Sequence, residues 1–360
     1  MHLAAVIAVN ITVYISGHGF GHLAQMAPVM KHLREQQPDC RFLVRCALDR
    51  HEIGARLGFD VELEQSPVDV GVVQKNAIEE DREASIIGIR TWLDSVDDQI
   101  KREIDLLASF RTDLVISDIS PLAFPAARAL GVPGVGLATL DWFTIYAHWL
   151  AADDAVLEKL THAYSQCDLL LTPPMAMDMP VFPVRRQIPL IAAYPSGKTC
   201  PPEKKRSKTA LVIFGGSNQP AFDVQALAAM DDWQFLMPLA PTDAPDNVTS
   251  VSFGRDLKAV DLMPFVDVVV CKPGYGILAE CWATATPIAW VERPDFPEYP
   301  MLKGWLQNGF PSCGMNRSDF SRSLWLPALE GALACRRQFP QISADGAQVA
   351  ATEILACLNG

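Results

Sequence analysis

The sequence predicts an α/β protein made of two domains in tandem, each built around a parallel sheet. Apolar, β-branched runs alternate with stretches of helical spacing in both halves of the chain, which is the pattern of βαβ units. The length of 360 residues exceeds what one hydrophobic core usually supports. A proline-rich stretch at 172–208 marks the change of domain. We therefore expect an N-terminal domain at 1–190, a C-terminal domain at 191–345 and a last helix at 346–360 that can dock back on the N-terminal domain.

The composition is that of an ordinary globular protein, with 49% hydrophobic and 20% charged residues. A net charge of −12 argues against a general nucleic-acid binder, but a few local cations and backbone amides can still hold a phosphorylated small ligand. The nine cysteines are scattered without a Cys-x-x-Cys pair, which fits a reducing compartment. The apolar start lacks the basic residues of a signal peptide, and no uncharged apolar run is long enough to span a membrane. We expect a cytoplasmic protein.

The first half alternates expected strands with expected helices. The strands are 11–16, 41–47, 114–117 and 134–137, and the helices are 23–35, 51–57, 89–110 and 121–130. Residues 66–85 are polar and show no clear period, so a mobile loop is expected there.

A second sheet is expected after a linker that carries the basic cluster 204–206. Its strands are 210–214, 233–237, 248–253, 266–271 and 287–291, and the last helix covers 346–358.

Three glycine-bearing turns follow expected strands, at 17–22, 215–217 and 274–276. Backbone amides in such turns can close on phosphate without basic side chains. Any one of them alone is equally consistent with a plain strand-to-helix turn, but three at matching strand ends favour a ligand site. The first turn carries Gly17, Gly19 and Gly21 and lacks the Gly-x-Gly-x-x-Gly spacing of dinucleotide sites, so a nicotinamide cofactor is not expected.

Two histidines lie on the first turn, His18 and His22. Imidazole titrates near working pH, so both are candidate general bases, although a lone histidine is more often structural. Asp118 follows the strand 114–117 and would project toward the same edge of the sheet. It can orient a histidine, bind substrate hydroxyls or cap the helix that begins near Pro121.

The stretch 272–280 opens a helix with glycines and places Glu280 one turn after Gly276. A carboxylate there can accept hydrogen bonds from the vicinal diol of a ribose. The alternative is a helix-favouring glutamate near the positive end of the helix dipole.

Two further groups have open interpretations. Acids in the segment 293–298, such as Glu298, can hold sugar hydroxyls or belong to a solvated loop. Trp142, Tyr146 and Trp149 share one face at helical spacing, which usually means core, although aromatic faces also stack on sugars or touch membranes. The chain has no Asp-x-Asp triplet and no Walker motif, so we expect a site without metal.

At these residues the chain resembles GT-B glycosyltransferases. The segments 214–217, 268–280 and Pro287 look like the donor half of glycosyltransferase family 28, and 17–22 looks like its amino-terminal glycine loop. A narrower resemblance is to the glycosyltransferase-like region of plant-type L-arabinokinases and their stand-alone bacterial relatives, on the segments 17–22, 117–121, 141–146 and 272–276. It covers about residues 11–310, and the kinase domain of arabinokinases is not expected, because no Gly-Leu-Ser-Ser-Ser-type loop is found.

The resemblance implies a GT-B fold, in which two Rossmann-like domains face each other across a cleft. It also implies a nucleotide-sugar donor, with a UDP-sugar favoured, an unidentified acceptor and no cofactor or metal. His22 would lie near the reaction centre, whereas His18 has no counterpart in the peptidoglycan enzyme of family 28. The implied donor-binding residues are Gly215, Gly216, Ser217, Lys272, Gly274, Tyr275, Gly276, Glu280 and Glu298. Lys272-Pro273 replaces the Arg-Ser common in the family.

Three hypotheses remain open from the sequence. The first is an inverting, metal-independent glycosyltransferase. The second keeps the fold for a nucleotide-sugar epimerase or hydrolase. The third is a nucleotide-sugar-binding protein without catalysis, since a fold does not determine a function.

Overall fold

A computed structural model describes residues 9–18, 20–199, 201–214, 222–254, 256–335 and 337–358. The chain divides into two compact units. Unit 1 contains residues 1–73, 81–191 and 343–360, and unit 2 contains residues 74–80 and 192–342. The chain therefore passes between the units four times, and a short piece of its first half belongs to unit 2.

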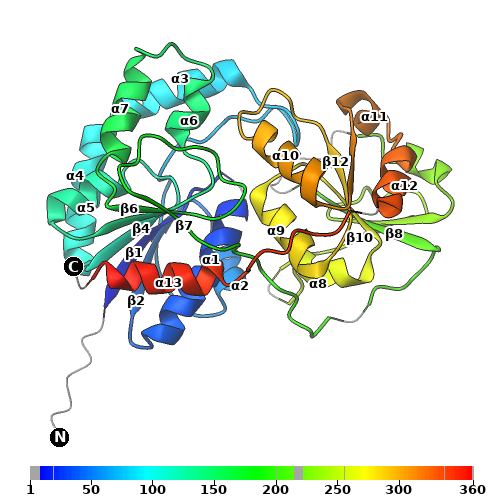
Figure 1. The fold of residues 1–360 in the computed structure, drawn as a ribbon, viewed down its shortest axis with the longest axis horizontal. Helices are drawn as coiled ribbons and strands as arrows, with labels where there is room; N and C mark the ends of the chain where they lie inside the picture. Colours follow the sequence, from blue (N-terminus) through cyan, green and yellow to red (C-terminus); the bar gives the residue numbers. More distant parts are fainter. Residues whose placement is uncertain are drawn as a thin grey trace, which may run out of the picture. The chain divides into compact units, whose positions relative to one another are not determined.

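Unit 1 is built on a parallel sheet of seven strands in the order β3-β2-β1-β4-β5-β6-β7 (Figure 1). The strands are β1 Asn10–Tyr14, β2 Arg41–Cys46, β3 Glu62–Gln65, β4 Leu114–Ser117, β5 Gly134–Leu137, β6 Leu169–Thr172 and β7 Arg185–Gln187. The first six strands follow the Rossmann order, in which the strand order reverses between β1 and β4. Ligands of such sheets bind at this reversal, outside the carboxyl ends of the strands.

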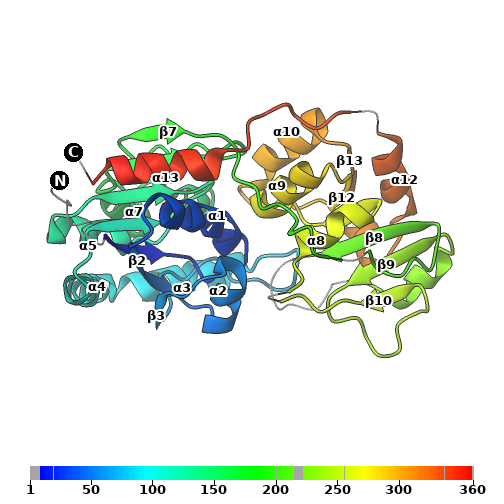
Figure 2. The same cartoon turned by 90° about the horizontal axis from the view of Figure 1, so that it is seen from below.

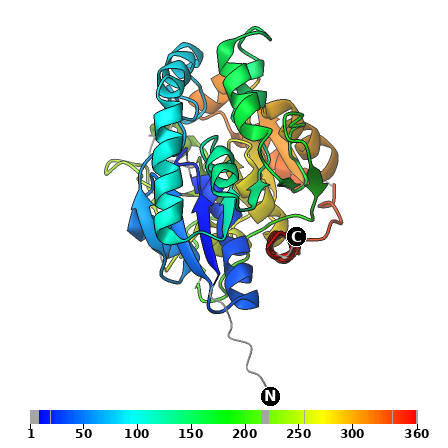
Figure 3. The same cartoon turned by 90° about the vertical axis from the view of Figure 1, so that its left-hand side faces the viewer.

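Helices cover both faces of this sheet. They are α1 Phe20–Gln36, α2 Arg50–Leu57, α3 Arg82–Leu93, α4 Val96–Phe110, α5 Ala123–Leu130, α6 Trp142–Ala147, α7 Ala155–Tyr164 and α13 Gly346–Ala356. Figures 2 and 3 show α4 on one side of the sheet and α13 on the other. Leu107 of α4 and Ala126 of α5 bury Tyr14 and Val115 of the sheet, and α13 packs on α1. The last helix of the chain is thus part of unit 1.

Unit 2 is built on a parallel sheet of six strands in the order β10-β9-β8-β11-β12-β13. The strands are β8 Lys208–Ile213, β9 Trp233–Met237, β10 Val248–Ser250, β11 Val268–Cys271, β12 Ile288–Val291 and β13 Ser312–Met315. The helices are α8 Ala259–Leu262, α9 Tyr275–Thr284, α10 Tyr299–Gly309, α11 Arg317–Ser321 and α12 Leu326–Ala334, with short 3-10 turns at Gln225–Ala229 and Met263–Phe265. Counted from β8, this is again the Rossmann order, reversing between β8 and β11.

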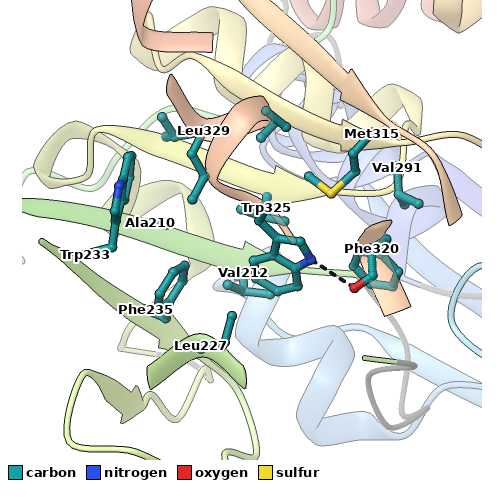
Figure 4. Close-up of a cluster of buried hydrophobic side chains, with 14 of the residues drawn as sticks. Ala210, Val212, Leu227, Trp233, Phe235, Val291, Met315, Phe320, Trp325 and Leu329 are labelled. Atoms are coloured by element: carbon teal, nitrogen blue, oxygen red, sulfur yellow. Dashed lines mark hydrogen bonds between the residues drawn. The ribbon is translucent and has the colours of Figure 1, made fainter. Parts of the chain in front are cut away.

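An aromatic core fills one face of the second sheet (Figure 4). Phe320 and Trp325 stack with ring centroids 5.6 Å apart, and the Trp325 indole donates to the Phe320 carbonyl at 2.9 Å. These rings pack on Val212 and Phe235 of the sheet. Burying such large rings supplies much of the apolar area that stabilises a domain.

The structure corrects several expectations about individual elements. The single helix expected at 89–110 is two helices, α3 and α4, because the side chains of Ser95 and Gln99 both donate to the Trp92 carbonyl at 3.2 Å and end the first one. The linker expected at 172–208 contributes β7 to the first sheet. Strands β3, β6, β7 and β13 were not expected. Within the described residues, no helix is long and apolar enough to cross a membrane.

The segment 66–85 is not the mobile loop that its polarity predicts. Val68, Asp69 and Val72 are buried in unit 1, whereas Ala77 and Ile78 are 1% and 3% exposed in the core of unit 2. Long-range burial of these few apolar residues orders the segment, and a local sequence period does not reveal such burial.

Candidate active site

In unit 1 the candidate residues flank the reversal of strand order. The glycine turn follows β1, and Asp118 follows the neighbouring strand β4. Helix α1 begins at Phe20, so His22 lies in its first turn. Gly19 lies outside the described residues, as do Gly215, Gly216 and Ser217 of unit 2. The structure thus brings His22 and Asp118 to the part of the sheet where Rossmann folds bind ligands.

His22 and Asp118 form a buried pair. Nδ1 of His22 lies 2.9 Å from Oδ2 of Asp118, and their side chains are 17% and 2% exposed. The carboxylate also accepts hydrogen bonds from the backbone amides of Ser16 and Ile119. Asp118 does not cap the following helix, because α5 has Leu122 at its N-cap position. Of the three roles open from the sequence, the geometry favours orienting a histidine.

The contact with Asp118 determines the tautomer of the neutral His22 ring. Because Nδ1 faces a carboxylate oxygen, the neutral ring carries its proton on Nδ1 and its lone pair on Nε2. An imidazole held in this tautomer by a carboxylate is the arrangement of a general base.

His18 lies in a different environment. Its ring meets the Trp142 ring edge-on, with centroids 5.8 Å apart. Its backbone amide donates to Oγ of Ser16 at 3.3 Å. A Cβ atom on Gly71 would come within 2.5 Å of Nδ1 of His18, and Gly71 has a φ of +64°, so the close approach requires glycine on two grounds. These contacts hold the His18 ring by packing.

Asp69 is a site residue that the sequence did not indicate. Its carboxylate accepts from Oγ of Ser16 at 3.1 Å and from the Trp142 indole at 3.1 Å. Burial raises the pKa of Asp69 to about 6, and the charge of Asp118 adds to this rise. The only sequence signal for Asp69 was its place between apolar residues, in a segment without helical or strand periodicity.

The aromatic stripe belongs to the core of unit 1. Trp142 and Tyr146 are 1% and 0% exposed. The Tyr146 hydroxyl donates to the carbonyls of Gly71 and Ser85 at 2.8 and 3.2 Å. Trp149 is partly buried against Tyr146, with ring centroids 5.6 Å apart. Trp142 therefore positions Asp69, Tyr146 positions the backbone at Gly71 and Ser85, and both rings are buried in the core.

In unit 2 the second set of candidates follows β11. Gly274 is the N-cap of α9, and Tyr275 and Gly276 form its first residues. Lys272 is partly buried and donates to Oε1 of Gln74 at 3.4 Å. Burial lowers the pKa of Lys272 to about 8. A nearby anion would stabilise the charged form of this partly buried ammonium group. Together with the backbone amides at the start of α9, Lys272 could therefore bind a phosphate.

The acids of unit 2 are more buried than a surface interpretation allows. Glu280 lies in the second turn of α9 and is 6% exposed. Glu298 precedes α10, makes no side-chain cap bond and is 5% exposed. The solvated-loop interpretation of 293–298 is wrong for Glu298 and Arg293, whereas Asp295 is exposed and pairs with Arg317 at 2.8 Å.

A hairpin from the first half of the chain completes this part of unit 2. Residues 74–80 close through an antiparallel bridge between Gln74 and Glu80. Glu80 forms an ion pair with Arg293, and both side chains are nearly fully buried. Burial lowers the pKa of Arg293 to about 10. With Gln74 on Lys272, the hairpin contacts the residues that follow both β11 and β12. Across the described ranges, no cluster of three or more His, Cys, Asp or Glu residues is arranged to hold a metal ion.

No model of a known protein family matches the chain. The chain is 27% identical over 345 residues to an L-arabinokinase of Arabidopsis thaliana, a match that covers 90% of this chain and 32% of the relative. It therefore spans about a third of the length of that relative, as the resemblance to one region of arabinokinases predicted.

Solved structures with a similar fold are glycosyltransferases. The glycosyltransferase of kitacinnamycin superposes with a TM-score of 0.63 at 16% identity, covering 98% of this chain and 95% of that one. The glycosyltransferase VinC in complex with dTDP gives 0.57 at 17% identity, covering 98% and 96%. MurG of Acinetobacter baumannii gives 0.53 at 15% identity, covering 97% and 99%. With two Rossmann-ordered units, the chain has the fold of GT-B glycosyltransferases.

Proposed function

We propose that the protein transfers a sugar from a nucleotide-sugar donor to an acceptor hydroxyl, with inversion at the anomeric carbon and without a metal ion. The observation that carries this proposal is the buried His22–Asp118 pair at the strand reversal of unit 1. An alcohol is a weak nucleophile, and a positioned base raises its reactivity. The GT-B fold and the likeness to an arabinokinase region support the choice of reaction.

In the proposed reaction Nε2 of His22 takes the proton of the acceptor hydroxyl. The hydroxyl oxygen attacks the anomeric carbon and forms the new glycosidic bond. The bond between that carbon and the diphosphate oxygen breaks, and the electron pair leaves with the nucleoside diphosphate. Asp118 stabilises the imidazolium that forms on His22, since an opposite charge at hydrogen-bond distance favours the protonated ring.

Unit 2 would hold the donor. Gly215, Gly216 and Ser217, together with the amides at the start of α9, would face the diphosphate, whose charge is stabilised by a helix N-terminus. Lys272 would add one positive charge at the same turn. Glu280 would accept from the ribose diol, and Glu298 would contact the donor sugar. A UDP-sugar is the first donor to test.

Binding and turnover test this proposal in one series. Calorimetry with UDP-, dTDP- and GDP-sugars on the full chain should detect at least one donor. Absence of binding to every donor, with folded protein, would contradict the proposal. Donor consumption without any acceptor would instead identify a hydrolase or epimerase. Binding without turnover, unchanged in His22→Ala, would identify a protein that binds nucleotide sugars without catalysis.

A further inference from the structure

A second buried carboxylate, Asp69, lies in the same hydrogen-bonded network as the His22–Asp118 pair. Ser16 links the two acids: its backbone amide donates to Asp118, and its hydroxyl donates to Asp69. Ser16 is fully buried, and Asp69 is 8% exposed. One residue of the loop after β1 therefore fixes the positions of both carboxylates.

Asp69 also holds the groups that surround His18. The Trp142 indole that meets the His18 ring donates to Oδ2 of Asp69. The Ser16 hydroxyl that donates to Asp69 also accepts from the His18 amide. Because the Ser16 hydroxyl and the Trp142 indole both donate to the Asp69 carboxylate, Asp69 fixes the two side chains that contact His18.

We propose that Asp69 is a positioning residue that raises the proton affinity of His22 through its negative charge and keeps Ser16 oriented toward Asp118. The catalytic consequence rests on the proposed function, because a stronger base at Nε2 matters only where a hydroxyl must lose its proton. The effect of the Asp69 charge on His22 belongs to the protein alone and can be measured without substrate.

Charges around Asp69 come from several elements. Asp118 follows β4 and His22 lies on α1, and both interact electrostatically with Asp69. Tyr146 of α6, Tyr164 of α7 and Cys46 of β2 also face its charge. Burial raises the pKa of both tyrosines above its ordinary value, and it raises the pKa of Cys46 to about 12. These three groups stay neutral near pH 7, so of these five groups Asp118 and His22 are the ones whose charges act on Asp69.

The decisive experiment is an NMR titration of the His22 ring in the full chain, with its resonances assigned by their loss in His22→Gln. In Asp69→Asn, which preserves the size of the side chain and an acceptor oxygen, the pKa of His22 should fall by about 0.5 to 1 unit. The matched control is Asp141→Asn, because Asp141 is also buried and has a pKa raised to about 6, but its hydrogen bonds go to Thr144. This control should leave the pKa of His22 unchanged.

A second measurement on the unmodified chain applies even where Asp69→Asn does not fold. Coupled groups titrate together, so the His22 ring shifts should show an inflection near pH 6, where Asp69 gains its proton. A single-step His22 titration, or a His22 pKa unaffected by Asp69→Asn, would overturn the inference. A shifted pKa in a protein that turns over no donor would instead leave the inference intact and reject the proposed function.

Discussion

Glu80 and Arg293 are 213 positions apart in the sequence and form an ion pair inside unit 2, with both side chains about 5% exposed. The pair ties the 74–80 hairpin to the residues that follow β12. Removing one member of a buried pair leaves a charge without compensation, which commonly costs about 3–5 kcal/mol. The hairpin is therefore expected to be a structural part of unit 2.

Glu80→Ala tests this role of the hairpin. It should destabilise unit 2 by about 3–5 kcal/mol and raise amide exchange in β11 and β12, as followed by hydrogen-exchange mass spectrometry. The matched control is Lys75→Ala, because Lys75 is an exposed residue of the same hairpin and should change stability by less than about 0.5 kcal/mol. Equal effects of the two substitutions would show that the hairpin is not anchored by its ion pair.

The second prediction concerns a buried polar triad in unit 1, formed by Tyr14, Arg45 and Glu103. Glu103 of α4 accepts from the Tyr14 hydroxyl at 2.8 Å and from Nε of Arg45 at 2.9 Å. Glu103→Ala should cost unit 1 about 3–5 kcal/mol, because it leaves the Arg45 guanidinium buried and unpaired. Tyr14→Phe removes one hydrogen bond to a charged group and should cost only about 1.5–3 kcal/mol. Denaturant unfolding would refute this account if the order of the two losses were reversed.

The third prediction concerns the pH dependence of stability. Burial raises the pKa of Asp141 to about 6. In the unfolded chain the same group titrates near its ordinary pKa of about 3.9, so between these values the folded state binds more protons. Stability from this group is therefore present below about pH 4 and is lost as the pH rises toward about 6, by up to about 3 kcal/mol.

Asp141→Asn isolates this contribution, since asparagine also serves well at the N-cap of α6. Unfolding free energies measured near pH 4 and near pH 7 should differ less in the variant than in the unmodified chain. Asp69 has its pKa raised to about 6 as well, so part of the dependence should remain. Parallel pH profiles for the two proteins would show that Asp141 is not titrating as its burial requires.

The sequence predicts the regular parts of the fold well, because their signals are local. Strands β4, β5 and β9 begin and end where their apolar runs predict. Two of the missed strands, Glu62–Gln65 and Arg185–Gln187, are polar and lack the apolar pattern that buried strands show. A third, Leu169–Thr172, is apolar and buried, but it was assigned no element because it lies at the start of the expected linker. The break between α3 and α4 rests on two side-chain hydrogen bonds to one carbonyl, without a proline or glycine.

The candidate site likewise contains some residues that the sequence could indicate and others that it could not. His22 and Asp118 could be named in advance, because each follows a strand whose position the sequence predicts. Asp69 and Glu80 could not, since their roles depend on partners far away in the chain, Trp142 and Arg293. The sequence of 66–85 shows only that the segment is polar and has no helical or strand periodicity. In the structure, burial of the few apolar residues between the acids fixes the position of each acid.

The most direct test of the central claim is a comparison of donor binding and sugar transfer in the unmodified chain, in His22→Ala and in Asp118→Asn. We expect kcat to fall by about 10²- to 10⁴-fold in both variants, because the base is lost in one and its tautomer is no longer fixed in the other. Donor affinity, measured by calorimetry, should stay within about twofold, because the proposed donor contacts lie in unit 2. Transfer that proceeds at an undiminished rate without the His22 imidazole would contradict the account.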